Sequence, residues 1–143
     1  MMNKKMIRLL ALVLCLAALG VTVLSGCGQK AEPTETVALL HDGDTLGEGS
    51  TEFLFRVKNL EGEELTVTIH TNQEMVGKAL QELKLVAGED GDFGLYIKTV
   101  NGQTLDFDKD GHYWAFYEGD TYASQSADQT KIVPGSVYTL AAE

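Results

Sequence analysis

Cys27 is the residue whose side-chain chemistry the sequence indicates most directly. Three features precede it in order, namely a basic start with Lys4, Lys5 and Arg8, an apolar run over residues 9–23, and the small residues Ser25 and Gly26. A basic start, a short apolar core and small residues before a cut site are typical of an export signal. We therefore expect residues 1–26 to be a signal peptide that is removed before Cys27.

The sequence Leu24-Ser25-Gly26-Cys27 resembles the lipobox of bacterial lipoproteins. This resemblance implies that Cys27 carries the lipid and becomes residue one of the mature chain. The alternative is an uncleaved membrane anchor, but the uncharged stretch from Leu9 to Leu24 is shorter than the ~20 residues of a spanning helix. We expect a lipid-anchored protein on the extracytoplasmic face of a bacterial membrane, at the cell surface or in the periplasm.

The aromatic run from Tyr113 to Tyr117 is the main candidate for ligand contact. On a strand the two tyrosines share one face, whereas Trp114 and Phe116 share the other. One pair is expected in the core, and the other could offer flat apolar surface with a polar tip to a planar ligand or a partner protein. The alternative, that all four fill a sheet–helix interface, stays open. We take Tyr113, Trp114, Phe116 and the neighbouring His112 as candidate ligand contacts.

Residues 106–111 carry acids at alternate positions followed by a glycine, as at the start of a calcium loop. The twelfth position of such a loop is Tyr117 in place of a bidentate glutamate, so a charged turn is the favoured interpretation and we expect no metal site. His41, His70 and His112 are scattered along the chain, and no hydrolase or nucleotide-binding motif is present. We expect neither catalysis nor a cofactor.

Charge and cysteine content narrow the choice of partners. Removal of residues 1–26 leaves 117 of the 143 residues, enough for one domain. This part has eight Lys and Arg against 21 Asp and Glu, so its formal charge is −13, against −10 for the whole chain. Such an acid excess repels phosphate polymers and argues against nucleic acid as a partner. Once Cys15 is removed and Cys27 lipidated, no cysteine remains for a disulfide or a thiolate metal site.

Residues 27–50 are predicted to be the lipidated N-terminus and a flexible tether, with a strand conceivable only at the apolar patch 37–40. From Thr51 the pattern changes, because residues 51–58 and 63–70 alternate in a way typical of half-buried strands. The residues 59–62 between them have turn chemistry, which predicts a hairpin. The side chains expected to point inward are Phe53, Phe55, Val57, Leu65, Val67 and Ile69.

One short helix is predicted next, with Asn72 as its N-cap and Gly88 at its end. Its apolar stripe consists of Val76, Ala79, Leu80 and Leu83. Strands are expected again at 94–100, 103–107, 112–117, 121–123 and 136–140, and Asn101-Gly102 predicts a hairpin turn between the first two. A hairpin, a helix on one face and a final strand predict an α+β fold of the β-grasp kind over residues 51–143, with a mixed sheet and one short helix.

The second half of the chain resembles the transcobalamin-like C-terminal domain family (DUF4430). The resemblance is carried by Gly94-Leu95-Tyr96-Ile97, Val100-Asn101-Gly102, Tyr113-Trp114-Ala115-Phe116-Tyr117 and Pro134-Gly135-Ser136-Val137-Tyr138. It covers about residues 53–140 and implies a β-grasp domain that binds soluble ligands. In the animal vitamin B12 carriers such a domain closes over cobalamin held against a larger helical domain. That helical partner is missing here, so cobalamin is a candidate ligand by analogy only.

Two hypotheses about function follow. The first is a ligand-binding module that captures a corrinoid such as cobalamin, or another bulky nutrient, beside a membrane importer. Its lipid would hold it near that importer and raise the effective concentration there. The second is a docking module that binds a protein or a glycan at the cell envelope. Neither hypothesis includes catalysis.

Overall fold

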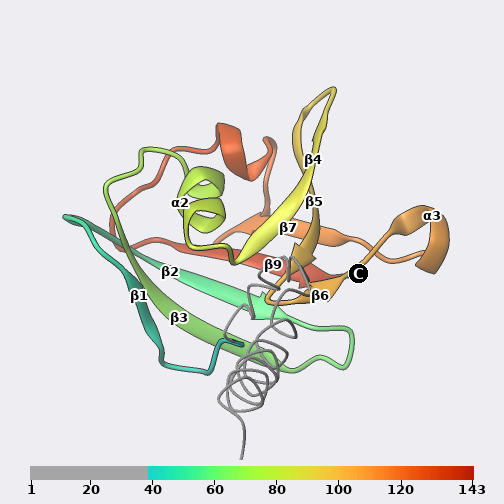
Figure 1. Cartoon of the computed structure of the whole chain (residues 1–143), viewed down its shortest axis with the longest axis horizontal. Coiled ribbons are helices and arrows are strands. Elements are labelled where there is room, and N and C mark those ends of the chain that lie inside the picture. The colour runs from blue at the N-terminus through green and yellow to red at the C-terminus, as the bar shows by residue number, and fades with distance from the viewer. Residues whose placement is uncertain (1–38) are drawn as a thin grey trace, which may run out of the picture. The chain divides into compact units, whose positions relative to one another are not determined.

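The structure, a computed structural model, describes residues 39–143 (Figure 1). The predicted signal peptide, Cys27 and the first part of the predicted tether lie outside the described residues. The described part is mostly β-sheet with few and short helices, so its class is α+β or mostly β. In chain order its elements are β1 (Thr45–Gly47), β2 (Thr51–Lys58), β3 (Glu64–Thr71), α2 (Val76–Glu82), β4 (Val86–Gly91), β5 (Gly94–Val100), β6 (Gln103–Thr104), α3 (Phe107–Asp110), β7 (Trp114–Glu118), β8 (Thr121–Tyr122), the 3-10 helix η1 (Ala127–Gln129) and β9 (Val137–Ala142).

The strands form two sheets. The main sheet has six strands in the order β1-β3-β2-β9-β7-β8, and the small sheet has three in the order β4-β5-β6. Within the main sheet β9 runs parallel to β2 and antiparallel to β7. Figure 1 shows α2 and the projecting β4–β5 hairpin on the same side of the main sheet. This side is therefore covered, and it holds the core.

The hairpin predicted at residues 51–70 is confirmed as β2 and β3. The two strands are antiparallel, and Phe53 pairs with Ile69 and Phe55 with Val67. All four of these side chains are at most 1% exposed. The alternation of apolar and polar residues was sufficient here because one face of the pair is buried and the other is not.

A single buried cluster fills the space between the main sheet, α2 and the small sheet. Aromatic residues from three strands meet in it, since Tyr138 of β9 stacks on Phe116 of β7 and meets Phe53 of β2 edge-on. Its largest fully buried side chains are Tyr138, Phe53, Phe55, Ile69, Leu80, Leu140, Val67, Val76 and Val100.

The helix α2 differs from its prediction at both ends. Its apolar stripe is confirmed, with Val76, Ala79 and Leu80 fully buried. The predicted N-cap is wrong, because α2 starts after Met75, and the Asn72 side chain instead accepts a hydrogen bond from the backbone N–H of Ser50 (3.1 Å). The predicted end at Gly88 is also wrong, since the chain leaves the helix at Lys84, which has a φ of 57°.

The strand β4 was not predicted. Its sequence Val-Ala-Gly-Glu-Asp-Gly is poor in the β-branched and aromatic residues that favour strands. It pairs with β5 through a register shift between Ala87 and Gly88. A Cβ at Gly88 would lie 2.0 Å from the carbonyl oxygen of Tyr96, so only glycine allows the two strands to approach.

The turn predicted at Asn101-Gly102 is confirmed. Both residues have positive φ, 47° and 77°, and they join β5 to β6. The strand predicted at 103–107 is shorter than expected, because β6 ends at Thr104. The chain then forms the short helix α3, whose N-cap Asp106 accepts a hydrogen bond from the N–H of Asp108.

Residues 39–50 contribute the strand β1 (Thr45–Gly47) to the main sheet. The strand β1 pairs in parallel with β3, and the N–H of Gly43 donates to the carbonyl of Thr66 (2.8 Å). Leu40 is 7% exposed and belongs to the core cluster. The folded domain therefore starts before Thr51, the boundary predicted from composition.

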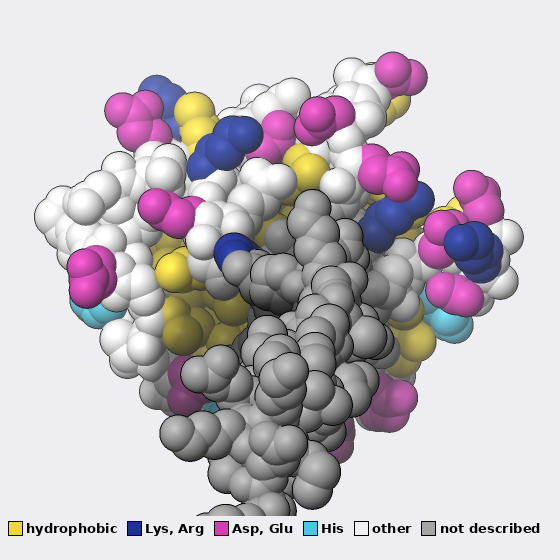
Figure 2. All heavy atoms as spheres, in the orientation of Figure 1, with side chains coloured by type: hydrophobic (Ala, Val, Ile, Leu, Met, Phe, Trp, Pro, Cys, Tyr) yellow, Lys and Arg dark blue, Asp and Glu magenta, His cyan; other side chains and the backbone are white. Residues whose placement is uncertain are grey.

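Acidic side chains dominate the charged groups on the face shown in Figure 2, notably over α3 and at the tip of the β4–β5 hairpin. None of the helices in the described part has both the length and the apolar character needed to cross a bilayer.

The neighbours Leu39 and Leu40 provide a test of whether residues 39–50 belong to the fold. Leu39 is 63% exposed, whereas Leu40 is 7% exposed. We expect Leu40→Asp to lower the free energy of unfolding by about 3 kcal/mol, since it places a charge in the core. Leu39→Asp is the matched control and is expected to change it by less than about 0.5 kcal/mol. Urea unfolding measures both, and equal midpoints would assign this segment to the tether.

Candidate functional site

A cleft of about 710 Å³ opens beside β7, and we call it the aromatic cleft. Four parts of the chain surround it, namely the β4–β5 turn, the start of β7, β8 with the loop that follows, and η1. The residues that line it are Gly91, Asp92, Phe93, Gly94, Leu95, Tyr96, Tyr113, Trp114, Phe116, Tyr122, Ala123, Ser124, Gln125, Ser126 and Gln129.

Three of the four candidate ligand contacts lie together in this cleft. Tyr113, Trp114 and Phe116 all line it. The predicted alternation is present, because Trp114 and Phe116 are 5% and 9% exposed on the core side, while Tyr113 is half-buried on the other. The pair that lies on the core side therefore also forms part of the cleft wall. Contact with a ligand stays a prediction.

Trp114 has an unusual polar environment. Its indole nitrogen Nε1 is buried and has no hydrogen-bond partner. A buried donor without a partner costs about 1–3 kcal/mol. Such a cost is often kept where a group serves binding, because a bound molecule can supply the missing acceptor.

The rim of the aromatic cleft contains aromatic residues that the sequence analysis did not select. Phe93 is 89% exposed at the tip of the β4–β5 hairpin, Tyr122 is 58% exposed on β8, and Tyr96 is 39% exposed on β5. Phe93 had a usable signal, because it is a large apolar residue within the turn sequence Gly91-Asp92-Phe93-Gly94. The position of Tyr96 depended on β4, which was not predicted.

Asp128 joins two of the segments that surround the cleft, the start of β5 and η1. Its carboxylate accepts a hydrogen bond from the N–H of Leu95 (2.9 Å). Burial raises the pKa of Asp128, but the Ser126 hydroxyl and the Leu95 N–H favour the charged form and bring the pKa below its usual value. Gly94 is needed here, since it has a φ of 104° and a Cβ would lie 2.1 Å from the Ser126 hydroxyl.

His112 does not line the aromatic cleft. Its Nδ1 lies 3.1 Å from the backbone oxygen of Glu143, and its side chain is exposed. The structure therefore separates it from Trp114 and Phe116, with which it was grouped on sequence adjacency alone. His112 lies before β7, which starts at Trp114, so the strand geometry that orients Trp114 and Phe116 does not extend to it.

The Glu143 carboxylate accepts hydrogen bonds from two tyrosine hydroxyls on the outer face of the main sheet. Tyr113 donates to one carboxylate oxygen (3.2 Å), and Tyr117 donates to the other. The hydrogen bond to Glu143 is the main cause that raises the pKa of Tyr117 to about 12. Burial, followed by Glu143, raises the pKa of Tyr113. Both hydroxyls therefore stay protonated at neutral pH.

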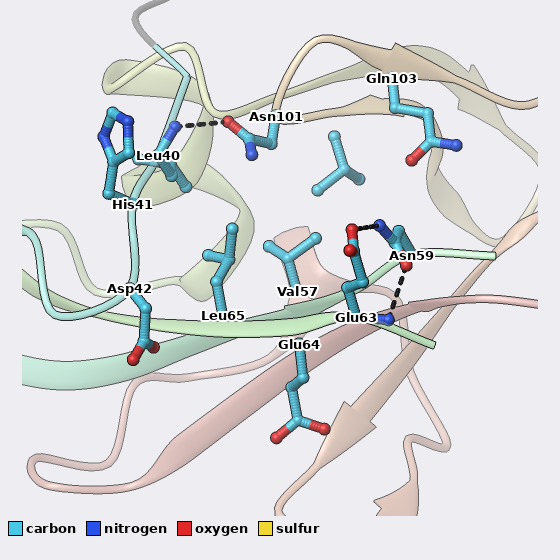
Figure 3. Close-up of a pocket in the computed structure, with 11 residues that line it drawn as sticks. Leu40, His41, Asp42, Val57, Asn59, Glu63, Glu64, Leu65, Asn101 and Gln103 are labelled. Carbon is cyan, nitrogen blue, oxygen red and sulfur yellow. Dashed lines mark hydrogen bonds between the residues drawn. The ribbon is translucent and has the colours of Figure 1, made fainter. Parts of the chain in front are cut away.

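A second hollow of about 360 Å³ lies between the β2–β3 turn and the β5–β6 turn (Figure 3). Two of the amide side chains that line it, Asn59 and Asn101, are engaged in hydrogen bonds. The Asn101 oxygen accepts from the N–H of Leu40 (2.9 Å), and Asn59 both donates to the Glu63 carboxylate and accepts from the Glu63 N–H. The hydrogen bonds drawn in Figure 3 hold the turns in place, so we assign this hollow a structural role.

The acidic loop at 106–111 caps a helix. Asp106 accepts from the N–H of Asp108 (3.1 Å), and Asp110 accepts from the N–H of Asp106 (3.0 Å). Asp106 also lies 3.6 Å from the ammonium group of Lys98. Within residues 39–143 no three His, Cys, Asp or Glu side chains cluster as metal ligands would.

Comparison with known proteins relates the chain to a solved structure. It is similar to a protein from Ruminococcus gnavus ATCC 29149 described as a "putative metal binding protein", with a TM-score of 0.62 and 29% sequence identity. The alignment covers 66% of this chain and 97% of that one. The two proteins therefore have related folds. No family model matches the chain, and no curated protein matches it.

The chain is also similar to haptocorrin in complex with Cbi, at a TM-score of 0.49 and 19% identity. This alignment covers 68% of the chain but only 26% of haptocorrin. At this level the likeness supports no conclusion about fold or ligand. The resemblance to the transcobalamin-like family therefore stays a prediction from sequence.

The Tyr117–Glu143 hydrogen bond gives a prediction about pH. Glu143→Gln removes the charge and the acceptor that favour the protonated phenol, so the pKa of Tyr117 should fall from about 12 toward 10.0. Tyrosinate absorbance measures this change, and Glu118→Gln, an exposed acid on the same strand, is the control. In the unaltered protein the unfolded Tyr117 loses its proton first, so stability should be constant below pH 10.0 and fall as pH rises to about 12. A tyrosinate curve unchanged by Glu143→Gln would contradict the assignment.

Proposed function

We propose that this protein is a lipid-anchored, extracytoplasmic ligand-binding module without catalytic activity, and that the aromatic cleft is its binding site. The observation that carries the proposal is the meeting of Tyr113, Trp114 and Phe116 with the rim residues Phe93 and Tyr122 around one cleft. Its volume of about 710 Å³ lies within the range of about 300–1,000 Å³ that is typical of ligand sites.

The chemistry of the cleft favours a bulky ligand with a flat apolar part. Exposed aromatic faces bind such groups by stacking, and their polar tips can hydrogen-bond at the edges. A corrinoid such as cobalamin meets this description, and the resemblance of the sequence to the transcobalamin-like family supports it as the first ligand to test.

We also propose that the domain is of the β-grasp kind. The hairpin β2–β3 is followed by α2, and the final strand β9 lies beside the hairpin, parallel to β2. This is the order of hairpin, helix and final strand that the sequence predicts for such a fold. The strand order β3-β2-β9-β7 supports the assignment.

Attachment to the membrane rests on the sequence around Cys27. A lipid on this residue would keep the cleft within a tether's length of a membrane importer, which raises the local concentration of captured ligand. The acidic composition supports attachment through acyl chains, because a formal charge of −13 after removal of residues 1–26 is repelled by an anionic membrane surface.

The description of the Ruminococcus gnavus protein makes metal a ligand to consider. In residues 39–143 the acids of the 106–111 loop are engaged in capping α3, and no cluster of three ligating side chains occurs. The aromatic cleft is lined mainly by aromatic and small residues, with Asp92 as its acid. We therefore propose an organic ligand.

A docking module is the second candidate function. It is favoured by Phe93, which is 89% exposed at the tip of a hairpin that projects from the domain (Figure 1). An exposed large apolar side chain on a projecting tip is suited to insertion into a partner protein. A ligand-binding module binds a small molecule in the cleft without a protein partner, whereas a docking module does not.

Calorimetric titration of the full chain with cobalamin and with cobinamide tests the first function. We expect heat of binding, and Phe93→Ser should weaken it about five- to tenfold through the loss of one aromatic contact. Val133→Ser is the matched control, since Val133 is an apolar residue that is 57% exposed and does not line the cleft. An absence of heat with high-micromolar corrinoid would remove the corrinoid and favour docking. Equal loss in both variants would place the ligand elsewhere.

The anchor has its own test. Cys27→Ser should abolish labelling by radioactive palmitate and release the protein from the membrane fraction. Cys15→Ser removes the other cysteine and is expected to leave labelling unchanged. Retention of Cys27→Ser in washed membranes would contradict lipid attachment at this residue.

A further inference from the structure

The outer face of the main sheet, opposite the core, contains a trough of about 280 Å³ that the proposed function does not use. We call it the outer trough. Small residues and a threonine form its floor, and charged and phenolic side chains form its walls. The residues that line it are Arg56, Lys58, Glu64, Tyr117, Gly119, Asp120, Thr139, Ala141 and Glu143.

The register of the sheet explains why these side chains converge. Tyr117 pairs with Thr139, and Thr139 pairs with Arg56 on the other side. Directly paired residues in a sheet point to the same face, so the short Thr139 side chain lies between two long ones. The same holds one row further along, where Ala141 is paired with Lys58.

The floor of the trough contains a polar atom without a partner. Thr139 is 8% exposed, and its hydroxyl is buried with no hydrogen bond. A buried hydroxyl without a partner lowers stability relative to a paired one. Valine would fill the same space on a strand without this cost, so the hydroxyl points to a molecule that hydrogen-bonds it.

The two walls present groups of both kinds, donors and acceptors. On one wall Arg56 Nε lies 3.2 Å from Glu64, and Lys58 makes no ion pair within the described residues. On the other wall the Glu143 carboxylate is held by the hydroxyls of Tyr113 and Tyr117. The Glu143 wall therefore does not have to reorganise in order to bind, which favours affinity.

The charges of the trough select the class of ligand. Two cations, Arg56 and Lys58, face three carboxylates, those of Glu64, Asp120 and Glu143. The three carboxylates would repel a small anion, and Arg56 and Lys58 would repel a small cation. An ion of either sign is therefore attracted by only part of the lining. A neutral molecule whose groups both donate and accept can use every wall.

We propose that the outer trough binds a neutral sugar. Each sugar hydroxyl both donates and accepts, so neighbouring hydroxyls can donate to Glu143 or Asp120 and accept from Lys58 or Arg56. The Thr139 hydroxyl bonds the ring from below, and the Tyr117 ring supplies an apolar wall for its C–H groups. The trough is thus a carbohydrate site on the face opposite the buried Trp114, and it shares no lining residue with the aromatic cleft.

Saturation-transfer NMR on the full chain tests this proposal with glucose, galactose, mannose, N-acetylglucosamine, cellobiose and maltose at millimolar concentration. We expect transfer to at least one of these sugars. Thr139→Val and Lys58→Met should each weaken binding about tenfold, the equivalent of one good hydrogen bond. Thr68→Val is the matched control, because Thr68 lies on the same sheet face on β3 but does not line the trough. Thermal unfolding of Thr139→Val should be unchanged or raised, since its hydroxyl is unpaired.

Trp114 is the single tryptophan of the chain and lies on the cleft side, so its fluorescence separates the two sites. Sugar binding that leaves the fluorescence unchanged and is weakened by Thr139→Val supports the trough. Three results would overturn the proposal. They are no transfer to any sugar of the panel, equal binding by Thr139→Val, Lys58→Met and Thr68→Val, and binding of free glycine, a zwitterion, in preference to every sugar. Loss of corrinoid binding would not affect it.

Discussion

Tyr138 on β9 makes the interactions on which the rest of the structure depends. Its ring stacks on Phe116 at 6.2 Å and meets Phe53 edge-on at 5.5 Å. Its hydroxyl accepts from the N–H of Val133 (2.9 Å) and donates to the carbonyl of Lys131 (3.1 Å). One side chain thus connects β2, β7, β9 and the loop before β9. Because the phenol tip is paired, the ring can be fully buried at no polar cost.

The central position of β9 follows from the same contacts. It lies between β2 and β7, which are more than fifty residues apart in the sequence, and it pairs with both. The hairpin at the N-terminal side and the aromatic strand β7 are held in one sheet only through it. The placement of both candidate sites on β7 therefore depends on the last strand of the domain.

The strand β7 shows how one strand can serve two sites. Its side chains alternate, so Trp114 and Phe116 face the core and the aromatic cleft, while Tyr117 faces the outer trough. Two of the buried polar atoms without a hydrogen-bond partner lie on opposite sides of the sheet in the same way. The Trp114 nitrogen lies on one side of the sheet, and the Thr139 hydroxyl, on the neighbouring strand, lies on the other.

Local patterns predicted the elements that depend on near neighbours. The alternation of Phe53, Phe55 and Val57 predicted a buried face, and Asn101-Gly102 predicted the turn that joins β5 to β6, because these signals act within a few residues. Elements formed by distant contacts were missed. The strand β4 has glycines and acids where strands favour β-branched residues, and β1 exists only because β3 offers a free edge.

The sequence by itself determined the export and lipidation prediction, the acidic character, the β2–β3 hairpin and the amphipathic stripe of α2, because each depends on residue type and short spacing. Only the tertiary structure decided which residues form a site. It brought Phe93, Tyr96 and Tyr122 to Trp114, left His112 apart, and set Thr139 between Arg56 and Tyr117. The reason is physical, since pairing register and sheet order place side chains next to each other across long stretches of chain.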